Sequence, residues 1–195
     1  MPKKRTNSER SKETIVAAAD TLIRRKGAAS ITVDQVAKEA GCAKGLVHYH
    51  FKTKRGVIEA VAQHVAASRT EAWVAAFRAP TPKGAIDQSW SLLTRESVDG
   101  TIRAWTSMFG QGGVIPEQTV RKSIEEFAGA LGRAADELLR DLDLEPTILP
   151  EENGWLLGAV VHGMGLELLS GADQEELEGA YAAAWLGILS LATPS

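Results

Sequence analysis

The sequence predicts an all-α protein, and three observations support this prediction. Apolar residues recur at intervals of three and four along most of the chain, as in Ile102, Trp105 and Phe109, which puts them on one face of a helix. Glycine and proline clusters, such as residues 79–82, divide the periodic stretches. No stretch alternates apolar and polar residues as a half-buried strand does. We therefore expect about nine helices, arranged as an N-terminal three-helix head, a helical connector and a C-terminal helical bundle.

The first helix is expected from about Ser8 to Lys26. Its apolar residues keep helical spacing and mark one buried face, which comprises Ile15, Ala18, Ala19, Leu22 and Ile23. The basic residues 24–26 lie in the last turn, where cations complement the helix dipole, and Gly27 ends the helix. The polar, basic arm of residues 1–9 precedes it. Two roles are compatible for this arm, disorder in the unbound protein and contact with DNA in the bound one.

Residues 32–54 have the pattern of a helix-turn-helix, the motif around which the head is organised. Thr32 is a suitable N-cap, and Gln35 stands three residues later, as a capping box requires. Gly41 is able to adopt the left-handed conformation that ends a helix. A second short helix then starts near Ala43. In a helix-turn-helix, this second helix enters the major groove of DNA.

This stretch resembles the DNA-binding core of the TetR family of bacterial repressors, over roughly residues 10–60. The matching positions are Ala17, Ala18, Leu22, Gly27, Thr32, Val36, Ala37, Ala40, Gly41, Lys44, Gly45, Tyr49, His50, Phe51, Lys54, Val57 and Ile58. The resemblance implies repression as the usual mode of regulation and an inducer pocket in the rest of the chain. The candidate DNA-binding residues are Thr32, Ala43, Lys44, Gly45, Leu46, His48, Tyr49, His50 and Lys54.

The chemistry of these residue types suits a polyanion whose bases must be read. Lys44, in the first turn of the recognition helix, can donate to guanine or to phosphate, and Gly45 allows the helix backbone to approach the groove. Tyr49 can stack on a sugar or donate its hydroxyl to phosphate, and His50 can do the same. Thr32 and Lys54 stand at two helix N-termini, which are suited to hold flanking phosphates. Each of these residues could instead be structural, as we expect for Val47 and Phe51 in the core of the head.

Two positions of the recognition helix depart from the usual pattern of the family. Leu46 stands where threonine or serine is common, so a hydroxyl is replaced by an apolar group that can meet a thymine methyl. His48 stands where tyrosine is common. It can still contact DNA, and its charge would make binding sensitive to pH. These differences predict a different operator sequence and leave the motif intact.

The charge distribution supports the division into head and body. Residues 1–55 hold 13 of the 22 basic residues and 5 of the 25 acidic ones, a net charge of +8, and the remainder carries −11. A basic segment that coincides with the motif indicates phosphate binding. We therefore predict a DNA-binding domain at residues 1–55 and a ligand-binding and dimerisation domain at residues 56–195.

Helical segments continue through the body. A connector helix is expected from Thr53 or Lys54 to Arg78, ended by Pro80 and Pro82. Further helices carry Ile86 to Leu93, Ile102 to Phe109, and Val120 to Leu142. The segment from Ile102 ends at the glycines Gly110, Gly112 and Gly113, and the following helix opens at Pro116 and Glu117. An eighth helix opens at Pro150 and ends near Gly171, and a ninth is capped by Asp173.

Aromatic residues of the body are candidates for an inducer pocket. All five tryptophans lie after the head, and apolar side chains with a few polar groups are typical of small-molecule sites. The candidate ligand-binding residues are Trp90, Trp105, Met108, Phe109, Phe127 and His162. For any one of these residues, ordinary bundle core is the simpler interpretation. His162 could also be a hydrogen-bonded interface histidine.

The last two helices are candidates for a homodimer interface at residues 150–193. The eighth helix is apolar and contains Gly158, Gly163 and Gly165, which permit a close helix approach. The ninth has a heptad-like seam. Two such helices from each subunit can form a four-helix bundle, and a reader of a palindromic operator needs two heads. The alternative is that both helices only close the core of their own subunit.

The sequence favours a transcriptional regulator, released from a palindromic double-stranded operator by a small apolar or amphipathic inducer. The alternative is a helical small-molecule-binding protein or enzyme with an incidental basic head. No HExxH, CxxC, GxSxG or phosphate-loop motif is present, so we expect no enzyme activity, no metal and no cofactor. A single cysteine, Cys42, suits the cytoplasm, and no apolar stretch is long enough to predict a membrane partner.

Overall fold

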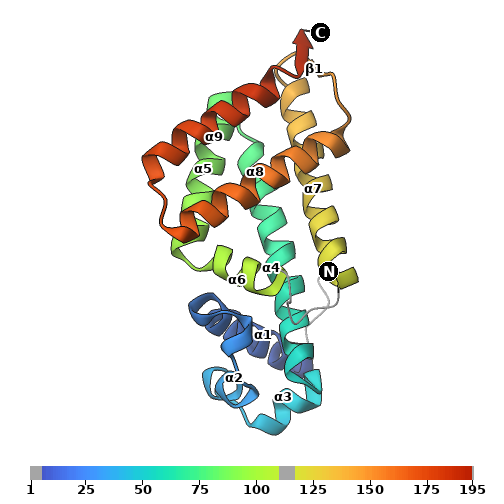
Figure 1. Cartoon of the computed structure of the whole chain (residues 1–195). Coiled ribbons are helices and arrows are strands. Elements are labelled where there is room, and N and C mark those ends of the chain that lie inside the picture. Colours follow the sequence, from blue (N-terminus) through green and yellow to red (C-terminus); the bar gives the residue numbers. More distant parts are fainter. Residues whose placement is uncertain (1–5, 110–116, 195) are drawn as a thin grey trace. The chain divides into compact units, whose positions relative to one another are not determined.

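A computed structural model describes residues 6–109 and 117–194, and within them it confirms the predicted all-α fold. The chain forms two compact units, a first unit of Met1–Val65 with Arg103–Glu117 and a second unit of Ala66–Ile102 with Gln118–Ser195. The elements, shown in Figure 1, are α1 (Asn7–Lys26), η1 (Ala28–Ser30), α2 (Val33–Glu39), α3 (Lys44–Phe51), α4 (Lys54–Phe77), α5 (Pro82–Val98), α6 (Thr101–Phe109), α7 (Glu117–Arg140), β1 (Leu144–Pro146), α8 (Pro150–Ser170), α9 (Gln174–Leu189) and β2 (Ala192–Pro194).

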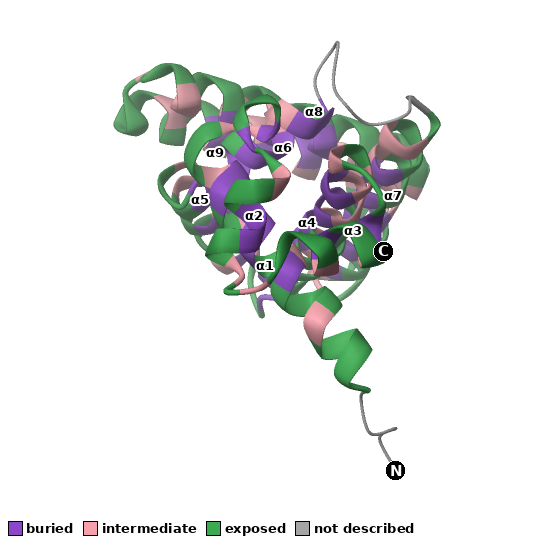
Figure 2. Cartoon of the chain, turned by 90° about the horizontal axis from the view of Figure 1, so that it is seen from below, coloured by how far each residue is buried: buried purple, intermediate pink, exposed green. Residues whose placement is uncertain are grey.

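Local signals in the sequence set the helix ends of the first unit. The Thr6 and Glu9 side chains form a capping box at the start of α1, one residue before the predicted start, and the first turns are exposed (Figure 2). The predicted box of Thr32 and Gln35 is present at α2, with the Thr32 hydroxyl accepting from the Gln35 N–H at 3.2 Å. Gly41 has a φ of +62°, so the predicted left-handed turn after α2 is confirmed.

The core of the first unit is small and apolar. The predicted face of α1 is buried in full, and it is joined by residues from η1, α2, α3 and the first half of α4: Ala28, Ile31, Val36, Ala37, Val47, Phe51, Val57, Ile58, Val61 and Val65. The predicted core positions Val47 and Phe51 are 1% and 8% exposed. Their burial holds α3 by one face, so its other face is available to solvent.

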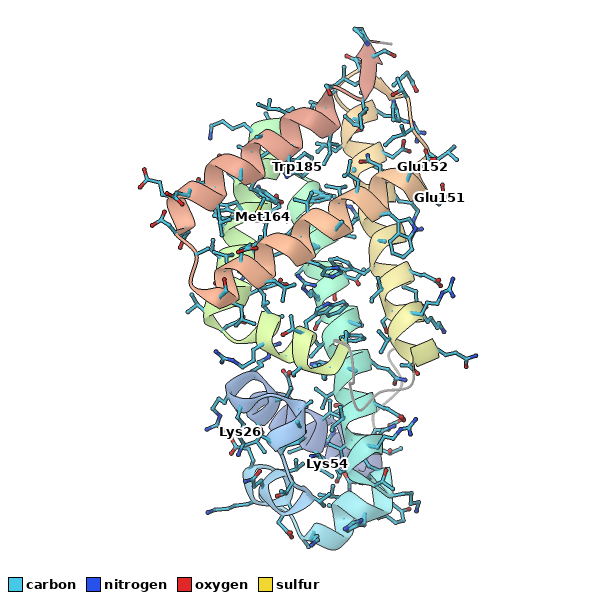
Figure 3. The ribbon with its side chains drawn as sticks, viewed as in Figure 1. Lys26, Lys54, Glu151, Glu152, Met164 and Trp185 are labelled. Atoms are coloured by element: carbon cyan, nitrogen blue, oxygen red, sulfur yellow. The ribbon has the colours of Figure 1, made fainter. Side chains whose placement is uncertain are left out.

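The second unit contains a close helix crossing between α7 and α8. A Cβ on Gly132 would lie within 2 Å of the Pro150 carbonyl oxygen, and one on Gly154 would lie 2.1 Å from the carbonyl oxygen of Ala128. Only glycine permits the two backbones to approach this closely. In the same unit, rings pack edge to face in the pairs Trp73–Phe77, Trp73–Phe127 and Phe77–Trp185, and Trp185 of α9 is labelled in Figure 3.

A buried ion pair ties α4 to α5 inside the second unit. Arg69 Nε donates to both carboxylate oxygens of Glu96, at 3.1 and 2.9 Å, and Trp73 Nε1 donates to Glu96 Oε1 at 3.0 Å. The two charged side chains are 2% and 4% exposed. Burial lowers the pKa of Arg69 and raises the pKa of Glu96, and each partner opposes the shift of the other.

Two details of the fold differ from the prediction. Strands β1 and β2 pair antiparallel, with Glu145 opposite Thr193, although no strand was expected. Each strand has three residues, too few to show an alternating pattern, and their partners are far apart in sequence. Helix α7 ends at Arg140, before the predicted Leu142. The predicted breaks at Gly110, Gly112, Gly113 and Pro116 lie outside the described residues.

The predicted domain boundary at residues 55/56 is a functional one and stays a prediction. The compact unit that contains the head is larger, because it includes α4 as far as Val65 and also residues 103–117. Across residues 6–109 and 117–194, no helix is both long enough and apolar enough to cross a membrane.

Candidate DNA-binding site

Helix α3 presents one face to solvent and buries the other. Lys44, Gly45, His48 and Tyr49 are exposed, whereas Val47 and Phe51 are buried. Exposed positions at intervals of one and four residues form a single stripe on a helix of 3.6 residues per turn. Ala43, the exposed N-cap of α3, extends this stripe at its N-terminal end. Five of the nine predicted DNA-binding residues therefore share one accessible surface.

Lys44 is held by an acidic neighbour from α2. Its Nζ lies 2.9 Å from Asp34 Oδ1 and 3.0 Å from Oδ2, and both side chains are more than half exposed. An exposed ion pair of this kind contributes little stability, so Lys44 can exchange Asp34 for a phosphate or a guanine at small cost. The sequence does not predict Asp34 as the partner, because the two residues stand ten positions apart.

Thr32 and Lys54 stand at the N-termini of α2 and α4, as predicted. The Thr32 hydroxyl accepts the Gln35 N–H, which leaves its own proton available to donate to a phosphate. Lys54, labelled in Figure 3, donates from Nζ to the carbonyl of Ala29 at 2.7 Å. This bond fastens the start of α4 to η1, so Lys54 has a structural role as well as its predicted contact with DNA.

Leu46 and His50 are half-buried. The Nε2 atom of His50 has no solvent access, and the ring packs edge-on against Tyr49 with centroids 5.1 Å apart. A DNA contact from His50 therefore has to use Nδ1. Tyr49 is 67% exposed, which suits the predicted contact with sugar or phosphate.

Lys52 also belongs to this surface, although the sequence did not predict it as a DNA-binding residue. It is exposed, it caps the C-terminus of α3 with a φ of +62°, and its Nζ lies 5.7 Å from the centre of the Tyr49 ring. The Lys52 carbonyl also lies 3.1 Å from His48 Nδ1. A positive φ at a lysine gives no signal in the sequence, since this conformation is ordinarily a property of glycine.

Helix α6 is bonded to the end of α1 within the first unit. Ser107 Oγ accepts the Ala28 N–H at 3.1 Å, and Arg103 Nη1 donates to the carbonyl of Arg24 at 3.2 Å. Gly27 has a φ of +80°, a backbone conformation that favours glycine, and a Cβ there would meet Ser107 Cβ at an ordinary 3.5 Å. Segments 79 residues apart in the chain are therefore bonded to one another.

The predicted ligand-binding residues are divided between the two units. Trp105, Met108 and Phe109 belong to the first unit, where the Trp105 and Phe109 rings stack at 4.2 Å. Trp90, Phe127 and His162 belong to the second unit. A surface hollow of about 430 Å³ in the second unit has other walls, namely Ala72, Ala75, Ala76, Asp87, Gln88, Ser91, Leu92 and Arg95. The shared role of the six predicted residues in one pocket stays a prediction.

Within the second unit, His162 belongs to the aromatic cluster. Its ring stacks on Phe127 with centroids 5.5 Å apart, and the Arg69 guanidinium lies 5.0 Å from the centre of the Phe127 ring. Burial, followed by the positive charge of Arg69, lowers the pKa of His162 to about 4. The ring is therefore neutral near pH 7 and able to make hydrogen bonds without carrying charge.

Helix α2 begins with a capping box, and α3 after it packs by its apolar face and exposes the other face. This arrangement defines a helix-turn-helix DNA-binding protein. Residues 15–61 match the family described as bacterial regulatory proteins, tetR family. This segment of the chain is therefore similar to the DNA-binding domain of TetR-family transcriptional regulators. The chain is a DNA-binding regulator of transcription.

Two curated relatives are transcriptional regulators of the helix-turn-helix type. The chain is 24% identical over 174 residues to the regulator BetI of Escherichia coli K12, which covers 85% of each chain. It is 29% identical over 104 residues to the regulator SrpR of Pseudomonas putida, which covers 53% of this chain and 46% of SrpR. This second match thus spans about half the length of SrpR.

Solved structures share the fold across most of the chain. A transcriptional regulator from Rhodococcus sp. RHA1 superposes with a TM-score of 0.74 at 20% identity, covering 93% of this chain and 97% of that one. A TetR-family regulator from Agrobacterium tumefaciens superposes with a TM-score of 0.70 at 18% identity, covering 93% and 99%. NalD of Pseudomonas aeruginosa, a secondary repressor of the MexAB-OprM multidrug efflux pump, has a TM-score of 0.57 at 18% identity, covering 91% and 98%.

Proposed function

We propose that this regulator is a homodimeric repressor that leaves a palindromic operator when a small apolar or amphipathic molecule binds in residues 56–195. The observation that carries the DNA-binding part is the exposed stripe of α3, with Lys44, His48 and Tyr49 on one accessible surface. Repression is supported by the relative NalD, which is a repressor. Dimerisation, release by a ligand and the individual contacts rest on the features that follow.

An apolar stripe on α8 and α9 supports dimerisation through residues 150–193. These two helices lie side by side in Figure 1, and each leaves apolar or small side chains exposed on successive turns. The large members are Trp155, Leu156, Leu166 and Leu186, which are 52%, 40%, 51% and 65% exposed. Gly163, Gly179 and Gly187 have nothing within 4 Å of a built Cβ, so a second helix has room to approach. Exposed apolar patches of this kind mark interaction sites, and a twofold dimer would cover the same patch on both subunits.

The aromatic rings and the neutral histidine of the second unit support a ligand that is largely aromatic or apolar. Phe127 is fully buried between His162 and Trp73, and the Trp90 ring packs on Tyr181 at 5.4 Å. A neutral His162 at the edge of this cluster can orient a polar group of the ligand without a charge having to be buried. The proposed ligand is therefore apolar with one or two hydrogen-bonding groups.

Helices α4 and α6 would couple ligand binding to DNA binding. Helices α4 and α6 each run from one compact unit into the other, and Arg103 and Ser107 of α6 bond to the end of α1. A ligand that favours another position of α6 or α4 would change the hold on α1. Two heads must sit about one DNA turn apart, roughly 34–36 Å, so a small displacement weakens binding.

The function is tested by band shifts with the DNA upstream of the chain's own gene. We expect a sequence-selective shift by the wild type that is lost in the Lys44→Ala, Tyr49→Ala double variant and weakens steeply as salt is raised. The small-molecule fraction of a cell extract should release the DNA, and a promoter–reporter fusion should rise when the gene is deleted. A flat salt response or a reporter that falls would contradict the proposal.

Sedimentation at micromolar concentration tests the dimer. We expect twice the mass of one chain for the wild type and the mass of one chain for the Leu166→Glu, Leu186→Glu double variant. Val98→Glu is the control, because Val98 is 88% exposed and belongs to α5 rather than to α8 or α9. A wild type that sediments as a single chain would refute the dimer without affecting the assignment of α3.

A further inference from the structure

The His48 ring is held by a reciprocal pair of bonds with Lys52. The Lys52 N–H donates to the His48 carbonyl at 3.0 Å, as the last helical bond of α3. His48 Nδ1 lies 3.1 Å from the Lys52 carbonyl oxygen. With a φ of +62°, Lys52 leaves the helical path, and its carbonyl stands beside the imidazole. The side chain of an exposed recognition-helix residue is therefore oriented before any DNA is bound.

This contact determines which ring nitrogen carries the proton. A carbonyl oxygen can only accept a hydrogen bond, so Nδ1 has to be the donor. In a neutral imidazole with a proton on Nδ1, the other nitrogen, Nε2, carries a lone pair and can only accept. In this neutral form His48 presents an acceptor, whereas a tyrosine at this position would present a hydroxyl that is able to donate.

The partners that DNA offers to a pure acceptor are few. Phosphate oxygens only accept, so neutral His48 cannot bond to the backbone through Nε2. In the major groove, guanine presents acceptors at N7 and O6, and thymine presents an acceptor and a methyl group. Only the amino groups, N6 of adenine and N4 of cytosine, donate there. An acceptor on the exposed stripe of α3 thus distinguishes adenine and cytosine from guanine and thymine.

We propose that His48 is a specificity-determining residue, whose Nε2 accepts a hydrogen bond from an adenine or cytosine amino group at one position of each operator half-site. This inference rests on the proposed placement of α3 in the major groove. It assigns to His48 a base contact rather than a backbone contact. The departure from tyrosine then changes what the helix reads and does not merely weaken its hold on phosphate.

Site selection from randomised duplex DNA with the full-length protein tests this inference. The wild type should select adenine or cytosine at one position per half-site. His48→Ala and His48→Phe, the second of which keeps a ring without nitrogens, should accept all four bases there and retain the rest of the site. His48→Gln should favour adenine, which glutamine bonds through N6 and N7. Since His48 is exposed, all three variants should fold, and their circular dichroism checks this.

A base analogue gives a second measurement. Replacing the selected base by its analogue without the amino group, a purine or a pyrimidinone deoxynucleotide, should weaken wild-type binding about fivefold per half-site, as expected for one hydrogen bond. The same analogue should leave His48→Ala unchanged. Tyr49→Phe is the control, which should lower affinity for all sequences and keep the wild-type selection.

The outcomes separate this inference from the regulator function. Selection of guanine at the His48-dependent position, or identical sites for wild type and His48→Ala, would overturn the inference and leave the regulator intact. An equal penalty for the analogue in both proteins would overturn it as well. If the wild type selects no sequence, the regulator function fails, and the inference fails with it.

Discussion

The first and second units place their polar side chains in opposite ways. In the first unit, Lys44, His48 and Tyr49 stand on the surface of an eight-residue helix, and apolar residues behind them form the core. In the second unit, Arg69 and Glu96 lie inside the core beside aromatic rings. A surface that meets a polyanion needs exposed donors, whereas charges in a core stabilise only when they are paired. The two units are therefore vulnerable to different substitutions.

The largest expected effect comes from Arg69→Ala. Removing this cation leaves the Glu96 carboxylate buried without its counter-charge, so we expect a loss of about 3 kcal/mol in the free energy of unfolding. Urea denaturation measures this change. Arg78→Ala is the control, because Arg78 directly follows the same helix and pairs with Glu137 at 3.9 Å on the surface, and it should cost less than about 1 kcal/mol. Equal losses would mean that the buried pair is not a special feature of the second unit.

A glycine substitution at the helix crossing should have the next largest effect. Gly154→Ala puts a methyl group 2.1 Å from the carbonyl oxygen of Ala128, which forces α7 and α8 apart and should cost about 1–3 kcal/mol. Gly158→Ala, one turn later, meets Ala128 Cβ at an ordinary 3.9 Å and should be neutral or slightly stabilising. Thermal unfolding of both variants compares them. Two equally stable variants would indicate that the crossing relaxes without cost.

The second unit should also lose stability in mild acid because of His162. Its pKa is lowered to about 4 in the folded protein, below the ordinary value near 6.5 of the unfolded chain. The unfolded chain therefore binds more protons, and stability falls as the pH decreases from about 6.5 to 4. We expect about 1–2 kcal/mol less stability at pH 5 than at pH 7 from this residue. Urea denaturation of His162→Gln at both pH values should show a smaller difference than the wild type.

The smallest effects are expected at the exposed pair of the first unit. Lys44→Ala should weaken DNA binding by about 1 kcal/mol. It should also reduce the slope of log affinity against log salt concentration by about 1. Asp34→Asn should strengthen binding, because it removes a negative charge near the phosphates and the competitor for Lys44. Neither variant should change stability by more than about 0.5 kcal/mol. Fluorescence anisotropy with labelled operator measures both, and a weaker Asp34→Asn complex would contradict the assigned role of the pair.

Local sequence determined most of the head. The box of Thr32 and Gln35, the left-handed Gly41 and the buried Val47 depend on neighbours within a few residues, and the structure has each of them as predicted. Helix periodicity likewise gave the nine α-helices of the described residues, usually within two residues at each end. Spacing along one helix is a local property, so the pattern of apolar residues suffices to find it.

Tertiary structure decided the contacts between distant residues. Arg69 and Glu96 stand 27 positions apart, and Ala28 and Ser107 stand 79 apart. No spacing rule connects them, because each pair forms only when separate helices pack. The same holds for the close approach of Gly132 to α8 and for the strands β1 and β2. The sequence alone thus identified a DNA-binding head on a helical body. The packed helices then determined that Lys44 faces Asp34, that His48 Nδ1 faces the Lys52 carbonyl, and that Arg69 and Glu96 are buried as a pair.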